Sequence, residues 1–175
     1  MTLAACAALV KRGDPDRFAA AMAAPAAART RLWPLYAFNL EVARIPWMTQ
    51  EPMIAEMRLQ FWRDVVAGTG PGAPPAHEVA GPLIALIAAA DLPVAVFDQL
   101  ILARHWDIGR APFADQNAFD TYLADSGGGL MWLAAKALGA PDAAEPLARN
   151  AGWAMALAGF LRAVPELEAR GRVPL

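Results

Sequence analysis

Two segments of the chain are long enough for a helix and almost free of charge, and they restrict the fold more than any other feature. Residues 127–138 contain one charged side chain, and residues 151–161 contain none. A helix that is apolar on nearly all sides belongs in the interior of a large bundle or in a membrane. Both segments fall short of the roughly 18–20 apolar residues that a membrane span needs. The sequence therefore predicts a soluble helical bundle built around these two segments.

The rest of the chain also predicts helices, so we expect an all-α fold in a single domain over all 175 residues. Alternating β-branched runs are absent, and Ala, Leu, Met and Arg dominate. Pro46 is expected to end the third helix, residues 68–76 to form a loop, Ser126 to cap the helix that follows it, and Asp142 with Glu145 to form a capping box. The expected helices are 3–11, 15–23, 26–45, 51–67, 79–90, 93–106, 116–125, 127–138 and 143–164.

Charge and cysteine content narrow the classes of partner and the compartment. The net charge of −2 argues against non-specific binding to nucleic acid. Cys6 is the only cysteine, so no internal disulfide can form and a reducing compartment is favoured. The N-terminus has no signal-peptide pattern, so we expect a cytoplasmic protein that is not secreted. Peripheral association with the inner membrane remains open.

Nucleophilic catalysis and zinc binding have little support in the sequence. Ser126 is the only serine, and its place before Gly127 suits a cap better than a nucleophile. His77, His105 and Cys6 lie far apart and show no ligand spacing. We therefore expect no catalytic triad and no metal site.

Magnesium chemistry lacks its usual ligands as well. A helix offers Mg²⁺ two carboxylates when they lie four residues apart on one face. None of the 17 acidic residues is four positions from another, and the one pair three apart is Asp142 and Glu145. No helix of the chain can present stacked carboxylates to a cation.

The region from Arg29 to Trp47 nevertheless resembles the first signature helix of the squalene/phytoene synthase family. It contains the pattern Arg-x-x-Leu-x-x-Leu-Tyr-Ala-Phe, ending at Phe38. Working enzymes of the family end this helix in Asp-Asp-x-x-Asp, and the matching positions here are Ala43, Arg44 and Trp47.

The second signature helix is altered in the same way. Residues 152–175 resemble it, with the usual Gln, Asn and two Asp replaced by Ala156, Gly159, Ala163 and Leu167. Residues 57–66 resemble the Arg-Leu-x-x-Trp-Arg helix of the family, and this chain keeps a family aspartate at Asp107, while another expected aspartate falls on Leu102. The resemblance implies an isoprenoid (terpenoid) synthase-type bundle, here possibly without its last helices.

One branch of this family, the phytoene-synthase-like assembly factors of respiratory complex I with relatives in α-proteobacteria, departs in the same way. The strings Ala37-Phe-Asn-Leu-Glu-Val-Ala43, Met57-Arg-Leu-Gln-Phe-Trp62 and Leu161-Arg-Ala-Val-Pro165 are similar to that branch. The resemblance implies a pseudoenzyme without cofactor that acts as an assembly or scaffold factor, with complex I subunits as protein partners.

Two alternatives remain open at this stage. A divergent prenyl-diphosphate synthase, a transferase of isoprenoid biosynthesis, would need Mg²⁺ held by scattered acids such as Glu41, Asp107 and Glu166. An isoprenoid- or lipid-binding module would keep the apolar cavity without the chemistry. If the family assignment is correct, positions 43, 47, 163 and 167 should line one apolar pocket. The candidate residues for cavity or partner binding are Tyr36, Asn39, Glu41, Arg58, Trp62, Arg63, Asp107, Arg162 and Glu166.

Overall fold

The computed structural model describes residues 2–68, 77–109 and 111–172, and no strand is present in these ranges. The all-α prediction is confirmed. Part of the predicted loop, residues 69–76, lies outside the described residues. The helices are α1 (Leu3–Gly13), α2 (Pro15–Ala23), α3 (Ala26–Arg44), α4 (Pro52–Ala67), α5 (Ala80–Ala90), α6 (Val94–Ala103), α7 (His105–Ile108), α8 (Gln116–Leu123), α9 (Gly129–Ala137) and α10 (Glu145–Ala169), with a 3₁₀ turn η1 (Ile45–Trp47), a π turn η2 (Ala124–Gly128) and a 3₁₀ turn η3 (Asp142–Ala144).

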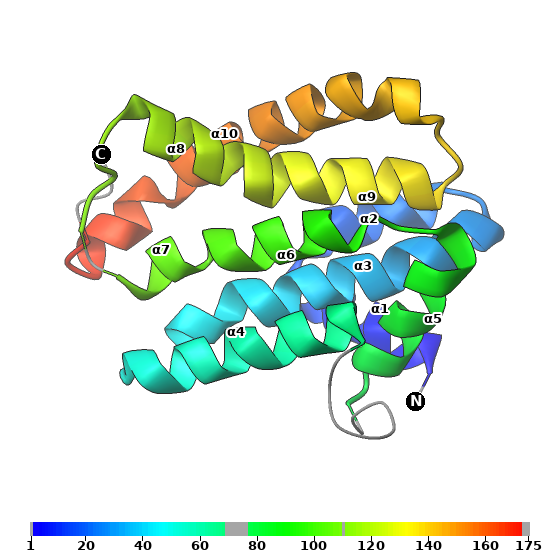
Figure 1. Ribbon diagram of the computed structural model, residues 1–175, viewed down its shortest axis with the longest axis horizontal. Helices are drawn as coiled ribbons and strands as arrows, with labels where there is room; N and C mark the ends of the chain where they lie inside the picture. Colours follow the sequence, from blue (N-terminus) through cyan, green and yellow to red (C-terminus); the bar gives the residue numbers. More distant parts are fainter. Residues whose placement is uncertain (1, 69–76, 110, 173–175) are drawn as a thin grey trace.

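The long helices run side by side (Figure 1). α6 lies in the middle, between α4 on one side and the α8–α9 helix on the other. α10 packs along η2 and α9, and α1 and α2 pack on α3. This arrangement brings α3, from the first part of the chain, into the same region as α10 from the last.

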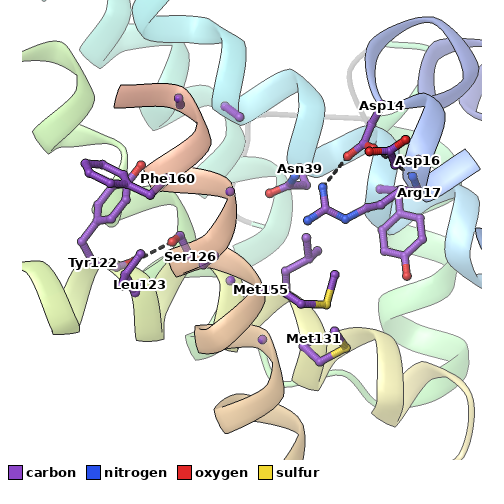
Figure 2. A pocket seen from close by; sticks show the side chains of 18 of the residues that line it. Asp14, Asp16, Arg17, Asn39, Tyr122, Leu123, Ser126, Met131, Met155 and Phe160 are labelled. Atoms are coloured by element: carbon purple, nitrogen blue, oxygen red, sulfur yellow. Dashed lines mark hydrogen bonds and ion pairs between the residues drawn. The ribbon is translucent and has the colours of Figure 1, made fainter. Parts of the chain in front are cut away.

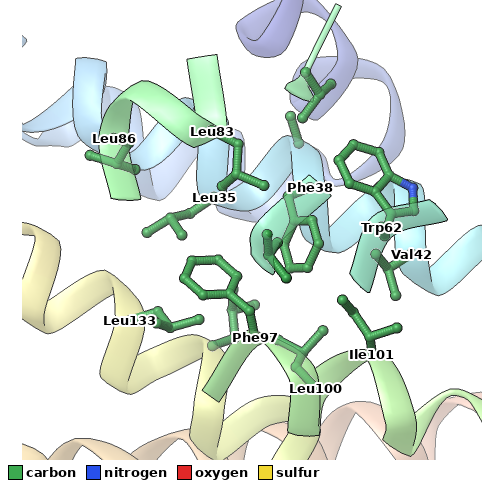
Figure 3. Packing of buried hydrophobic residues seen from close by; sticks show 14 of the residues in the cluster. Leu35, Phe38, Val42, Trp62, Leu83, Leu86, Phe97, Leu100, Ile101 and Leu133 are labelled. Carbon is green, nitrogen blue, oxygen red and sulfur yellow. The ribbon is translucent and has the colours of Figure 1, made fainter. Parts of the chain in front are cut away.

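Aromatic and branched side chains from α3, α4, α6 and α9 fill the main core (Figure 3). Phe38 is fully buried and makes edge contacts with Trp62 and Phe97, each at 5.4 Å between ring centroids. Leu100 and Leu133 complete this layer with no exposed surface. Burying large side chains of this kind stabilises a fold by roughly 1.5–3 kcal/mol each. The core therefore fixes α3 firmly against α6.

The predicted break at Ser126 is wrong. α8, η2 and α9 follow one another without interruption, and the Ser126 hydroxyl donates a 2.6 Å hydrogen bond to the carbonyl of Tyr122. A serine in a helix can bond back to the preceding turn in this way instead of capping. The π turn accommodates one more residue than an α-helical turn within this continuous helix, and such turns often lie at functional sites.

Other predicted boundaries also need correction. The expected helix 93–106 is divided into α6 and α7. The capping box is wrong, because Asp142 accepts a 2.6 Å hydrogen bond from Lys136 and begins the 3₁₀ turn η3. α10 continues past Pro165 to Ala169. The proline leaves the carbonyl of Leu161 without its usual donor, and Leu161 is 52% exposed, so water can reach this turn.

Pro46 has the effect that the sequence predicts. α3 ends at Arg44, and the chain continues as η1, in which Pro46 occupies an early position. None of the described helices is long and apolar enough to cross a membrane.

Candidate functional site

A cavity of about 660 Å³ lies between α2, α3, the α8–α9 helix and α10 (Figure 2). Most of its wall is apolar, and Met131 and Met155 lie beside it in the view. Its size is in the range of pockets that hold small organic molecules. Polar side chains gather at two places on the wall, one near α2 and one near α7.

Four of the positions where the resemblance predicts metal-binding aspartates line this cavity, and the fifth, Arg44, does not. Ala43 and Trp47 come from α3 and η1, while Ala163 and Leu167 come from α10. Ala156 and Gly159, at the other altered positions of the second signature helix, lie on the same wall. These four positions therefore line one cavity, from α3 and η1 on one side and from α10 on the other. We expected an apolar cavity, whereas its wall also contains polar and charged side chains.

The first polar group lies at the junction of α1 and α2. Asp14 caps α2 by accepting a 2.9 Å hydrogen bond from the backbone N–H of Arg17, and it also pairs with the Arg17 guanidinium. That guanidinium lies 5.7 Å from the ring centroid of Tyr36. Figure 2 shows Asn39, Arg17 and the carboxylates of Asp14 and Asp16 at this end of the cavity. Burial raises the pKa of Tyr36, so its hydroxyl stays protonated at neutral pH.

The second polar group links α6, α7 and α8. Arg104 donates hydrogen bonds to the Tyr122 hydroxyl at 2.9 Å and to the Asp107 carboxylate at 3.3 Å. Tyr122 donates to Asp107 at 3.1 Å. The three side chains line the cavity, and burial raises the pKa of Tyr122 to about 12. Every member of this group has a charged or hydrogen-bonded partner, so it forms a fixed part of the wall.

Arg172 holds the end of α10 against α7. Its guanidinium donates to the carbonyls of Trp106, Asp107 and Gly109 at 2.7–3.1 Å. It also lies 4.7 Å from the Trp106 ring centroid and 5.3 Å from that of Trp47, and it is only 5% exposed. This contact fixes the chain that follows α10 against α7 and against Trp47 of η1.

Two glycines let the π turn approach α10. A Cβ added at Gly127 would lie 2.6 Å from the carbonyl oxygen of Gly152, and one added at Gly152 would lie 2.6 Å from the Cβ of Met131. Both glycines line the cavity. They therefore serve tight helix packing and form part of the cavity wall at the same time.

The acids that a divergent synthase would need do not come together. Glu41 is buried and pairs with Arg44 at 2.6 Å, Glu166 pairs with Arg170 on the surface at 2.7 Å, and only Asp107 lines the cavity. Within residues 2–68, 77–109 and 111–172, no group of three or more His, Cys, Asp or Glu side chains could hold a metal ion. The side chains present do not fit the Mg²⁺ that the fold family implies.

The other candidate residues lie at separate places. Asn39 lines the cavity, and Arg162 does so from an exposed position on α10. Trp62 is part of the core, and Arg63 pairs with Asp98 at 2.6 Å. Arg58 is exposed on α4. Arg44 lies outside the cavity wall and is bound to Glu41, as described above.

The sequence analysis missed several residues of the cavity. Asp14, Asp16 and Arg17 line it, as does Arg104. Asp14 before Pro15 is a helix-start signal, but nothing in the sequence places it near α10, more than a hundred residues away. Asp14, Asp16 and Arg17 become part of the site only through the packing of α2 on α3.

Comparison with known proteins identifies relatives of the whole chain. The chain is 27% identical over 169 residues to NADH dehydrogenase (ubiquinone) complex I, assembly factor 6 of Bos taurus, which covers 96% of this chain and 51% of the relative. The corresponding human and mouse proteins are 25% and 26% identical over the same shares. The chain thus spans about half the length of these curated relatives. No solved structure matches it.

A family model that matches most of the chain shows the family. The model of the squalene/phytoene synthase family matches residues 10–175, which include α2, α3 and α10 and so both altered signature helices. The chain therefore belongs to the squalene/phytoene synthase family.

Proposed function

We propose that this protein is a non-catalytic assembly or scaffold factor for respiratory complex I. One observation carries the proposal. A cavity lies between α3 and α10, and Ala43, Trp47, Ala163 and Leu167 line it at positions where the resemblance leads us to expect metal-binding aspartates. Without bridging cations, a diphosphate inside an apolar bundle would lose its hydration with little compensation.

The relatives support the choice of complex I. The three mammalian proteins compared above are named as complex I assembly factors, and the match extends over 96% of this chain. The proposed partners are subunits or assembly intermediates of complex I. Because that complex is embedded in a membrane, we also propose peripheral association with the inner membrane.

An exposed apolar face on α4 is a candidate partner-binding surface. We define the α4 face as Met53, Ile54 and Met57 on the helix together with Met48 just before it, and their exposed fractions run from 43% to 71%. Exposed large apolar side chains that lie close together often mark protein interaction sites. Methionine suits such a surface because its unbranched side chain adapts to a partner.

The experiment is deletion of the gene in the source organism. The expected result is a fall in NADH oxidation by isolated membranes, with succinate oxidation unchanged as the internal control. Expression of the protein from a plasmid should restore activity. Unchanged NADH oxidation in the deletion strain would contradict the proposal.

A further inference from the structure

Two neighbouring side chains of α4, Met53 and Met57, are the most exposed of the described methionines, and we call them the methionine pair. Met53 is 71% exposed and Met57 67%, and the next most exposed, Met48, reaches 54%. The pair lies four residues apart on one helix, so both side chains stand on the same side of α4. The most accessible thioethers therefore lie together, on the α4 face proposed above for partner binding.

Hydrogen bonding separates the methionine pair further from other exposed methionines. Arg58 donates a hydrogen bond to the sulfur of Met48 at 3.9 Å, and Arg29 donates one to the sulfur of Met22 at 3.8 Å. Within the part of the chain that the structure describes, no hydrogen-bond donor reaches either sulfur of the pair. A sulfur lone pair that accepts a hydrogen bond is less available for reaction, so the pair is the more reactive as well as the more exposed.

The reaction open to such a thioether is oxidation by hydrogen peroxide. The sulfur lone pair attacks one peroxide oxygen, a sulfur–oxygen bond forms, and the O–O bond breaks. The second oxygen leaves with both hydrogens as water, so the sulfur is oxidised by two electrons and the peroxide is reduced by two. The product is a methionine sulfoxide, and reductases specific for its two epimers reverse the change.

Oxidation of the methionine pair changes the chemistry of the α4 face. A sulfoxide is polar, whereas the thioether is an apolar group that packs well against a partner. The sulfoxide oxygen binds water, and that water must be removed before an apolar partner can cover the face. The oxidised protein therefore binds such a partner more weakly than the reduced protein.

We propose that the methionine pair is a reversible oxidation site, at which peroxide converts Met53 and Met57 to sulfoxides and so releases the partner of the α4 face. The oxidation is a property of this chain alone. The release of a partner rests on the proposed function, so the two parts are tested separately.

The site is tested with the purified protein and dilute hydrogen peroxide, followed by tandem mass spectrometry of its peptides. The methionine pair is expected to form sulfoxide at least about threefold faster than Met48 and Met22. The same protein unfolded in urea should oxidise all four methionines at one rate, because exposure and hydrogen bonding are then equal. Equal rates in the folded protein would overturn the assignment of the site.

Reversal is tested on the oxidised protein. Addition of methionine sulfoxide reductases for both epimers, with a thiol reductant, should return the methionine pair to the thioether form. Sulfoxide that persists at the pair under these conditions would contradict a reversible site.

The release of the partner is tested in the gene-deletion strain with Met53→Leu and Met57→Leu in one protein. Leucine keeps an apolar side chain of similar size but has no sulfur to oxidise. Without peroxide, the wild type and this double variant should restore NADH oxidation equally. With peroxide present while activity is being restored, the wild type is expected to support several-fold less activity than the double variant.

Met22→Leu is the matched control, since it removes an exposed thioether from α2 and leaves the α4 face unchanged. It should follow the wild type with and without peroxide. Protection by Met22→Leu equal to that of the double variant would overturn the role of the pair.

The outcomes separate this inference from the proposed function. If neither the wild type nor the double variant restores activity without peroxide, the proposed function fails and the release fails with it, while the oxidation rates still decide the site. If both restore activity and lose it equally under peroxide, the release alone is refuted. The double variant should melt at the wild-type temperature, because both positions are exposed.

Discussion

Gly127 and Gly152 face each other where the π turn meets α10, and no side chain fits between them. A Cβ on Gly127 would lie 2.6 Å from the carbonyl oxygen of Gly152, closer than real Cβ atoms approach other atoms. The contact brings the two nearly charge-free segments together along one wall of the cavity. It gives a packing reason for the glycine that begins the first of these segments, residues 127–138.

The first prediction concerns this contact. Gly152→Ala should lower the free energy of unfolding by about 1–3 kcal/mol or more, because an inserted methyl group must displace backbone atoms. Gly159→Ala on the same helix should raise it by about 0.5–1 kcal/mol, because alanine is the better helix former and the site is open. Urea unfolding of both variants measures the difference. A stable Gly152→Ala protein would show that the helices can separate freely.

The second prediction concerns the polar group near α7. Asp107→Ala should lower the free energy of unfolding by about 3–5 kcal/mol, because it removes the carboxylate that pairs with the largely buried Arg104. Tyr122→Phe removes neutral and charge-assisted hydrogen bonds and should cost about 1–3 kcal/mol. Chemical denaturation checks both values. Wild-type stability of the Asp107→Ala protein would contradict the described geometry.

The third prediction is a dependence of stability on pH through Asp125. Burial raises the pKa of this half-buried carboxyl above its ordinary value of 3.8, and Arg149 partly opposes the rise. Since the unfolded chain releases this proton at lower pH than the folded chain, the group lowers stability as pH rises above about 3.8. Asp125→Asn should therefore melt at a slightly higher temperature at pH 7 and lose this advantage near pH 3.8 and below.

Calorimetric melting across this pH range is the measurement. Glu56→Gln, at an exposed position on α4, is the control for removing one negative charge. An identical gain in both variants would attribute the effect to net charge and not to burial of Asp125.

The fourth prediction concerns the α4 face. The double change Met53→Glu and Met57→Glu should reduce complex I activity several-fold in a complementation assay, because it places two charges on the proposed partner surface. The Met53 and Met57 side chains are 71% and 67% exposed, so the melting temperature should change little. Full complementation by the double variant would remove this face from the proposal.

Leu147 on α10 offers a matched control for that experiment. It is 76% exposed and lies on a different helix, so Leu147→Glu adds a charge to another apolar position. Its complementation should equal that of the wild type. A loss equal to that of the double variant would indicate a general effect of surface charge.

Helix order, the altered signature positions and the end of α3 could be predicted from the sequence, but the hydrogen-bond partners of Ser126 and Asp142 could not. Pro46 ends α3 because proline lacks an N–H, and that is a local property. The prediction for Ser126 is wrong because its hydroxyl donates a hydrogen bond to the Tyr122 carbonyl inside a continuous helix. That helix packs closely on α10 through Gly127 and Gly152. The Asp142 carboxylate accepts a hydrogen bond from Lys136 instead of capping a helix, and a capping pattern in the sequence does not reveal this contact.

The cavity, too, could be predicted from the sequence only in part. The resemblance to the family predicted that positions 43, 47, 163 and 167 converge, and all four line one cavity, two from α3 and η1 and two from α10. The polar end near α2 depends on how α1 and α2 fold back over α3, and short amphipathic helices carry no signal for their partner. Asn39 was recognised as a candidate from the sequence, and the structure places it on the cavity wall, 7% exposed.

We propose that this member of the family does not condense prenyl diphosphates. The most direct test is incubation of the purified protein with farnesyl diphosphate or geranylgeranyl diphosphate and Mg²⁺, followed by mass spectrometry of the extracted lipids. No C30 or C40 product above a protein-free blank is expected, while a working phytoene synthase serves as the positive control. A Mg²⁺-dependent C30 or C40 product that increases with protein concentration would contradict this proposal.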